Sequence, residues 1–374
     1  MSILDHSVQI NDGLTQTSAD GASLAFDKKY GIMFCAYMPG FQCHYGESRG
    51  KIALSYFPAS QPTNIRFVTV AEGDDVYCNN IWGLGNGKVR VFYEKYSRAE
   101  TEHRICYKDF TFPDGTLSEE KIMMLRRGDG TIVPLTIHEE LRYLEERGFK
   151  NHYHSSTEEI GHCAFFRGDD GYVYGAALSE YAEPILYRST DDAATVEFFA
   201  ICPHTAQYEI EYRFLNGTIH AIYRTDREKD SISYTSSPDL GKSWSEPINF
   251  KDSITCRPRM LVYNGHILTA YNYYNNDTKN RPEMQQARTS VRIRLGEHPD
   301  PNENVLLADL YSKCGIVNMS LCDIVNDLYF AYSTSELALE YQNGNPKVRG
   351  KDAIRYVKLG DLLPTGDDKN HVLR

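Results

Sequence analysis

The sequence has no long apolar run and no excess of positive charge. Its 374 residues are 41% hydrophobic and 24% charged, and no stretch reaches the roughly 18 consecutive apolar residues that a membrane-spanning helix needs. The formal net charge is -11, from 40 basic and 51 acidic residues, which argues against a general nucleic-acid binder. We therefore expect neither a nucleic acid nor a membrane as a partner.

Closely spaced cysteine pairs and a secretory leader are also missing. The nine cysteines are scattered without a CxxC pair, so neither a zinc ribbon nor a redox dithiol is predicted. His152 and His154 lie near His162, but no further spaced ligand accompanies them, and we predict no metal and no other cofactor. The N-terminus lacks a basic region followed by an apolar stretch, so we expect a signal peptide to be absent or already removed. The first case predicts a cytoplasmic location, and the second a secreted or periplasmic one.

The sequence is rich in β-forming residues, with 27 Tyr and 16 Phe, and turn dipeptides separate its strand-like segments. Hairpin turns are predicted at Asn86-Gly87, Asp170-Gly171, Asn216-Gly217, Asn264-Gly265 and Asn326-Asp327. The turns at 170, 216 and 264 are 46 and 48 residues apart. A period of this length with several strands in each repeat indicates the blades of a β-propeller.

These turns predict a single all-β domain over residues 1–374. Five turns and a first, less regular unit at 23–37 give a β-propeller of six blades. Seven blades are the alternative, because the interval between the turns at 86 and 170 is unusually long. Closure of the ring is expected to pair residues 7–10 with C-terminal strands such as 353–357.

The long interval contains one predicted helix within an insertion at residues 126–156. Thr136 and Glu139 have the spacing of a capping box, and Ile137, Leu141 and Leu144 form an apolar stripe. An inserted helix and loop on one face of a propeller often shape a binding rim. The alternative is a helix that covers a sheet edge.

A second motif supports the propeller. Residues 237–244 read Ser-Pro-Asp-Leu-Gly-Lys-Ser-Trp and fit the pattern S-x-D-x-G-x-[ST]-W, and residues 189–196 are a weaker copy. The chain therefore resembles the sialidase-like Asp-box β-propellers. The resemblance implies a structural turn between outer strands, in which the Asp caps backbone N–H groups and the Trp packs between sheets.

Spacing around the turn at 216 identifies candidate site residues. In sialidases a catalytic Glu lies eight residues before this turn, and sixteen residues after that Glu comes an Arg that binds the substrate carboxylate. The same spacing here gives Tyr208 and Arg224. The sialidase nucleophile has no counterpart within 315–321, and residues 23–40 contain no Arg. The pattern therefore disfavours sialidase activity.

Applying the eight-residue spacing to Asp170 gives His162, so His162 and Tyr208 hold equivalent positions on neighbouring blades. His162, Tyr208 and Arg224 together resemble the active site of ulvan lyases and related propeller lyases. The resemblance implies β-elimination next to a uronic acid, in which an Arg neutralises the carboxylate and His and Tyr exchange protons. Further substrate-binding residues are expected among those near the same end of the blades: His154, Arg257, Arg259 and Asn318.

The main functional prediction is a polysaccharide or oligosaccharide lyase whose partner is an acidic carbohydrate. One alternative is a sialidase-like exo-glycosidase that uses Glu209 or Glu211 with a second, unidentified acid. Another is a propeller that binds carbohydrate without catalysis. New ultraviolet absorbance from an unsaturated uronate product would distinguish the lyase from both alternatives.

Overall fold

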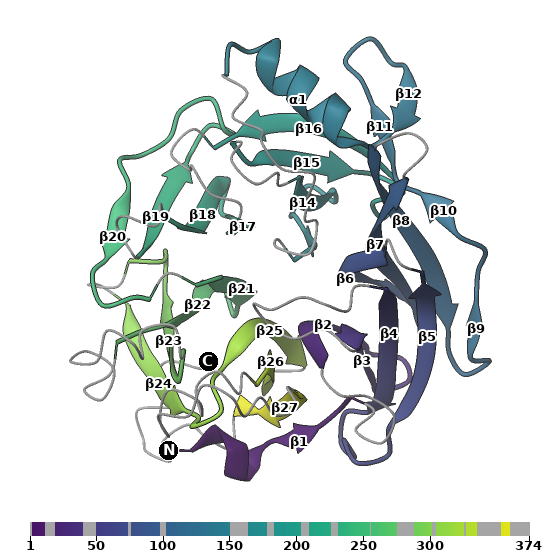
Figure 1. Cartoon of the computed structure of the whole chain (residues 1–374). Helices are drawn as coiled ribbons and strands as arrows, with labels where there is room; N and C mark the ends of the chain where they lie inside the picture. Colours follow the sequence, from purple (N-terminus) through teal and green to yellow (C-terminus); the bar gives the residue numbers. More distant parts are fainter. Residues whose placement is uncertain are drawn as a thin grey trace, which may run out of the picture.

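The chain folds into a six-bladed β-propeller, with six sheets arranged around a common centre (Figure 1). A computed structural model describes residues 2–11, 19–39, 50–73, 76–97, 102–149, 164–177, 183–202, 209–225, 231–254, 256–274, 288–300, 304–324, 327–334 and 353–359. Within these residues, no helix is long and apolar enough to cross a membrane.

Each blade begins with the strand nearest the centre and continues outward in hairpin order. Blades one and two contain β2 (Ala19–Asp27), β3 (Ile32–Pro39), β4 (Lys51–Pro58) and β5 (Arg66–Glu72), then β6 (Val76–Gly85), β7 (Lys88–Ser97), β8 (Glu102–Thr111), β9 (Thr116–Leu117) and β10 (Lys121–Ile122). Blade three contains β13 (Phe166–Arg167), β14 (Val173–Ala177), β15 (Ile185–Ser189) and β16 (Thr195–Ile201), extended by β11 (Met124–Arg126) and β12 (Ile132–Pro134). Blades four and five contain β17 (Ile210–Leu215), β18 (Thr218–Arg224), β19 (Ile232–Ser237) and β20 (Ile248–Phe250), then β21 (Arg259–Tyr263), β22 (His266–Asn272), β23 (Ser290–Gly296) and β24 (Val305–Tyr311). Blade six contains β25 (Val317–Ile324), β26 (Asp327–Ser333), β27 (Ile354–Lys358) and the N-terminal β1 (Val8–Gln9), which follows the short 3-10 helix η1 (Ile3–His6).

The two ends of the chain close the ring in blade six. β1 pairs antiparallel with β27, so that Val8 lies opposite Tyr356. The Ile10 amide donates to the Ile354 carbonyl at 2.9 Å, and the Ile354 amide donates to the Asn11 side chain at 3.0 Å. This pairing confirms the predicted closure, and β1 covers the outer edge of β27.

The long interval between the turns at 86 and 170 does not form a seventh blade in the part of the chain that the structure describes. Instead, β11 pairs in parallel with β16 and antiparallel with β12, so this hairpin extends the outer edge of blade three. A hairpin that pairs in parallel with a strand distant in the sequence produces no periodic pattern of turns. For this reason the sequence alone could not decide between six and seven blades.

The predicted helix is present as α1 (Ile137–Glu145) and lies at the outer circumference of the ring (Figure 1). The expected capping box is not formed, because Thr136 makes no side-chain cap hydrogen bond. The Glu139 carboxylate instead forms ion pairs with Arg127 and Arg142. The Tyr143 ring packs against Phe198 of β16 with ring centroids 4.9 Å apart. The helix thus covers an outer strand, and residues 150–156 of the predicted insertion lie outside the described residues.

Two polar turns hold the outer strands of blades three and four. In the turn after β19, the Asp239 carboxylate accepts from the Ser243 amide at 2.8 Å, and the Ser237 hydroxyl accepts from the Gly241 amide at 2.7 Å. Asp191 accepts from the Thr195 amide at 2.8 Å in the equivalent turn of blade three. These carboxylates are therefore engaged in closing turns, and we assign them no chemistry.

Six apolar clusters, one at each seam between neighbouring blades, form the core. The seam between blades four and five also buries His220 of β18, whose Nδ1 lies 3.0 Å from the Tyr234 hydroxyl. The Tyr234 ring in turn stacks on His298 with centroids 6.2 Å apart. Burial, and to a smaller extent the nearby His298, lowers the pKa of His220 to about 4 from an ordinary value of 6.5.

This pKa predicts a loss of stability in mild acid. The unfolded chain binds a proton at His220 below about pH 6.5, whereas the folded protein does so only below about pH 4. Stability is therefore lost as the pH falls from 6.5 to 4, by about 3 kcal/mol from this residue. We expect His220→Gln to flatten the pH dependence of the urea-unfolding free energy in that window. The exposed His266→Gln serves as the control, and equal slopes for wild type and His220→Gln would contradict the prediction.

Candidate functional site

The start of β17 and the end of β18 bring an acidic and a basic side chain together at one end of the two innermost strands of blade four. Glu209 immediately precedes β17, and Arg224 is the last residue of β18. The Arg224 amide donates to the Glu209 carbonyl at 2.9 Å. Their side chains form an ion pair with 2.8 Å between Arg224 Nη1 and Glu209 Oε2, and they are only 11% and 9% exposed.

The turn at Asn216-Gly217 sets this register. Both residues have positive φ, at 51° and 78°, as a two-residue hairpin turn requires. The pairing then runs without a bulge from Leu215 opposite Thr218 to Ile210 opposite Tyr223. Residues directly opposite each other project to the same face of a sheet. Glu209 thus shares a face with Arg224 without needing a bulge.

Glu211, the other carboxylate proposed from the sequence, lies in a network that links neighbouring blades. Its side chain is fully buried, with Oε1 2.6 Å from Arg213 and Oε2 2.8 Å from Arg259. The Ala164 amide of blade three also donates to Oε2 at 3.2 Å, and Arg259 donates from Nε to the Met319 carbonyl in blade six. Each carboxylate oxygen is thus within ion-pair distance of a buried arginine, so Glu211 is poorly placed to act on a substrate.

A buried thiol marks where charged side chains of blades four and five converge. Burial raises the pKa of Cys256, the cations Arg288 and Arg224 lower it, and the anion Glu209 raises it. All three charged groups therefore lie within electrostatic range of this thiol. Arg257 follows Cys256 directly and is also buried, as is Arg288. We refer to Glu209, Arg224, Arg257 and Arg288 as the arginine cluster.

Unusual backbone conformations occur beside this cluster. Arg288 and Asn318 have φ of 47° and 44°, in the left-handed region, which asparagine tolerates but which is costly for arginine. The side-chain amide nitrogen of Asn272 holds the two segments by donating to the backbone carbonyls of Arg288 at 3.3 Å and Ile316 at 2.9 Å. Asn318 lies within a shift of the strand register in β25. Strain of this kind is typical of functional sites, where the surrounding structure maintains it.

The residues predicted from the sequence divide into two groups. His154, His162 and Tyr208 lie outside the described residues. Arg224, Arg257, Arg259 and Asn318 are all described. Arg224 ends the second strand of blade four, whereas the other three lie just before or at the start of the innermost strands of blades five and six. The structure adds Glu209 as the partner of Arg224 and Arg288 as a further cation. No three His, Cys, Asp or Glu side chains of the described chain are grouped to hold a metal ion.

No protein-family model and no curated protein matches this sequence. Solved structures match it with little sequence identity. The sialidase of Trypanosoma rangeli in complex with sialic acid matches at a TM-score of 0.61 and 11% identity, over 96% of this chain and 58% of that chain. The K499G mutant of NanB sialidase from Streptococcus pneumoniae matches at 0.62 and 9%, over 94% and 70%. A protein of unknown function from Dyadobacter fermentans matches at 0.61 and 12%, over 94% and 98%.

At these identities the similarity concerns the fold alone. This chain spans little more than half the length of the Trypanosoma rangeli sialidase chain and nearly all of the protein from Dyadobacter fermentans. None of the three is described as a lyase. The chain therefore has a sialidase-like six-bladed β-propeller fold.

Proposed function

We propose that this chain is an exo-acting glycosidase that hydrolyses a terminal acidic sugar at the arginine cluster. The observation that supports the proposal is the Glu209–Arg224 ion pair, in which a carboxylate lies beside a guanidinium, a group well suited to binding carboxylates. The fold that the chain shares with sialidases supports the same class of reaction, since the sialidase from Trypanosoma rangeli was solved with sialic acid, an acidic sugar.

Arginine suits the recognition of such a sugar. A guanidinium group has five N–H donors in a planar fork and can bind a carboxylate with two parallel hydrogen bonds. Arg224 contacts Glu209 through Nη1, and a guanidinium group at this position suits the recognition of a substrate carboxylate. Arg257 and Arg288 add positive charge in a protein whose net charge is -11. This local cationic character favours an anionic substrate over a neutral one.

Glu209 is the described carboxylate best placed to move a proton during hydrolysis. Glycosidases commonly use one carboxyl group to protonate the leaving oxygen and another to activate water or attack the sugar. Glu211 is excluded from this role by its contacts to Arg213, Arg259 and Ala164. We propose Glu209 as one of the two proton-transferring groups.

The lyase predicted from the sequence is the competing hypothesis. It needs His162, Tyr208 and Arg224 in one cavity, and Arg224 alone is among the described residues. It also predicts a different product, because β-elimination creates an unsaturated uronate that absorbs ultraviolet light, whereas hydrolysis does not. The two hypotheses can therefore be separated by product analysis without any variant.

The direct test is an assay of the intact chain on fluorogenic glycosides of sialic acid, glucuronic acid and galacturonic acid, with glucoside and galactoside controls. Uronate-containing polysaccharides are incubated in parallel and monitored for new ultraviolet absorbance. We expect release of the fluorophore from at least one acidic glycoside, and little from the neutral pair. New absorbance without fluorophore release would instead support the lyase, and binding without turnover would support a carbohydrate-binding propeller.

Arg224→Lys should lower activity although it keeps the charge. Lysine cannot reproduce the planar fork that binds a carboxylate through two nitrogens. We expect kcat/KM to fall by about 10- to 100-fold, as for the loss of one hydrogen bond to a charged group. Arg188→Lys is the matched control, since Arg188 pairs with Glu197 at 2.6 Å in blade three. If both variants were as active as the wild type, Arg224 would not recognise the carboxylate of the substrate.

A further inference from the structure

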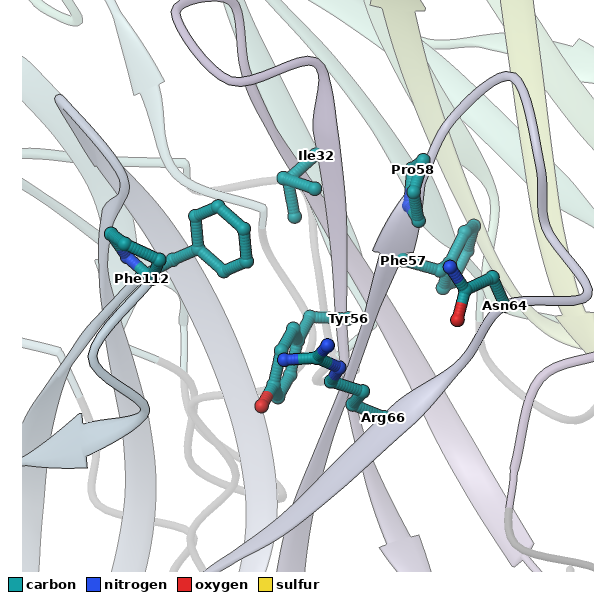
Figure 2. A pocket seen from close by; sticks show the side chains of 8 residues that line it. Ile32, Tyr56, Phe57, Pro58, Asn64, Arg66 and Phe112 are labelled. Carbon is teal, nitrogen blue, oxygen red and sulfur yellow. The ribbon is translucent and has the colours of Figure 1, made fainter.

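A separate pocket lies between blades one and two. Its volume is about 250 Å³, and its walls are dominated by apolar and aromatic side chains from β3, β4 and the segment after β8, with polar groups from the start of β5. Figure 2 shows Phe112 and Ile32 on one side, Phe57 and Asn64 on another, and Tyr56 with Arg66 between them.

This pocket is at the opposite end of the propeller from the arginine cluster. The cluster lies where the first strand of blade four begins. Strands alternate in direction within a blade, so the third strand, β4, ends at the far end. The pocket is formed by that end of β4, at Tyr56 and Phe57, and by the start of β3, at Ile32. The pocket and the arginine cluster therefore do not overlap.

The aromatic walls are held in place by one another. The Tyr56 ring packs against Phe110 and Phe112 with centroids 5.0 Å and 6.1 Å apart, and Tyr30 meets Phe112 edge-on at 5.4 Å. Phe57 is almost fully buried beneath the pocket. A pocket with walls of this kind is formed before a ligand binds, so little ordering free energy opposes binding.

The polar groups define the chemistry of the ligand. Arg66 is the one charged residue among the described residues that line the pocket, and it lies directly opposite Tyr56 in the pairing of β4 with β5. Its guanidinium is exposed and suits a carboxylate. The Asn64 amide and the Tyr56 hydroxyl can exchange hydrogen bonds with hydroxyl groups. A volume of about 250 Å³ is just below the usual range for drug-sized ligands, and it suits a single ring.

We propose that this pocket is a second, non-catalytic binding site for one pyranose ring that carries a carboxylate, such as a uronate unit. The apolar face of the ring would lie against Phe112 and Tyr56, and the carboxylate would pair with Arg66. This proposal does not depend on hydrolysis at the arginine cluster. A second site for an acidic sugar would hold a polymeric substrate to the protein and raise its local concentration.

The test uses the full chain with isoleucine methyl groups labelled with carbon-13 and observed by NMR. Ile32 lines the pocket, and Ile316 reports on the arginine cluster, because its amide donates to the Arg288 carbonyl at 2.9 Å. Glucuronate, glucose and benzoate are titrated separately. We expect glucuronate to shift the Ile32 signal saturably, with a Kd of about 1 mM for a ligand of this size, and glucose to bind more weakly.

Two variants and one control locate the binding. Phe112→Ala should weaken glucuronate binding at Ile32 by at least about 10-fold, through lost ring contact. Arg66→Gln should weaken it by roughly 5-fold, as for an exposed ion pair, and leave glucose unchanged. Phe67→Ala is the control, since Phe67 is exposed on β5 and does not line the pocket.

A glucuronate shift at Ile316 without one at Ile32 would overturn this proposal and leave the proposed function standing. Tighter binding of benzoate than of glucuronate would overturn the assignment to a sugar.

Discussion

Replacing Glu211 by glutamine is expected to lower the free energy of unfolding by about 3–5 kcal/mol, the usual cost of removing one partner from a buried ion pair. The glutamine side chain would have almost the same size but no charge, so Arg213 and Arg259 would remain in the interior without their common anion. The effect should be large because Glu211 is fully buried and also accepts from the Ala164 amide. Urea unfolding followed by circular dichroism measures it.

Glu197→Gln provides the matched control for this prediction. Glu197 pairs with Arg188 at 2.6 Å, but both side chains are at least a third exposed. An exposed pair of this kind typically contributes no more than about 1 kcal/mol, because water and salt screen the charges. We therefore expect Glu197→Gln to stay close to the wild type. Similar unfolding free energies for the two variants would show that the Glu211 network does not hold the inner strands together.

A double-mutant cycle then tests whether Glu211 and Arg259 act together. If the cost of Glu211→Gln comes from an uncompensated Arg259, the same change made in an Arg259→Met background should cost much less. Additive losses in the double variant would assign the instability to packing rather than to charge. The cycle also tests whether the contact of Arg259 with the Met319 carbonyl contributes independently.

Local turn chemistry explains why most of the fold could be predicted. Asn86, Asn216 and Asn264 all have positive φ and are each followed by a glycine that also has positive φ, and Asn-Gly is the dipeptide that adopts this pair of conformations most readily. The number of blades was harder to fix, because β11 joins blade three by parallel pairing with β16. Pairing between segments about 70 residues apart depends on tertiary packing and leaves no local pattern.

The candidate site was only partly predictable. The register around Asn216-Gly217 already places position 209 opposite Arg224, so the partner of this arginine could be found from strand pairing alone. The spacing of the sialidase pattern instead directed attention to Tyr208, one residue away. Arg288 carries no comparable signal, because it lies in no turn or spacing motif and its backbone adopts a left-handed conformation that is unusual for a non-glycine residue. Neither residue type nor spacing indicates that conformation.

Glu209→Gln should reduce turnover by at least about 100-fold, which is the usual contribution of a general acid or base. The amide keeps the shape of the side chain but cannot exchange a proton at working pH. Binding of the acidic sugar should persist, because the Arg224 guanidinium that we propose to recognise its carboxylate remains. Circular dichroism checks that the fold of the variant is intact. The control Glu197→Gln, which removes a carboxylate from another arginine pair, should keep its turnover.

Tyr208→Phe, measured beside Glu209→Gln, decides between hydrolysis and elimination. The variant removes only a hydroxyl group, so its activity reports directly on proton transfer by that group. In the hydrolase, Glu209 moves the proton and Tyr208→Phe should retain most of its turnover. In the lyase, the roles of acid and base belong to His162 and Tyr208, so Tyr208→Phe and His162→Ala should both lose at least about 100-fold. An active Glu209→Gln together with an inactive Tyr208→Phe would therefore overturn the proposed hydrolase, because it would show that the carboxylate beside Arg224 only balances the charge of the arginine.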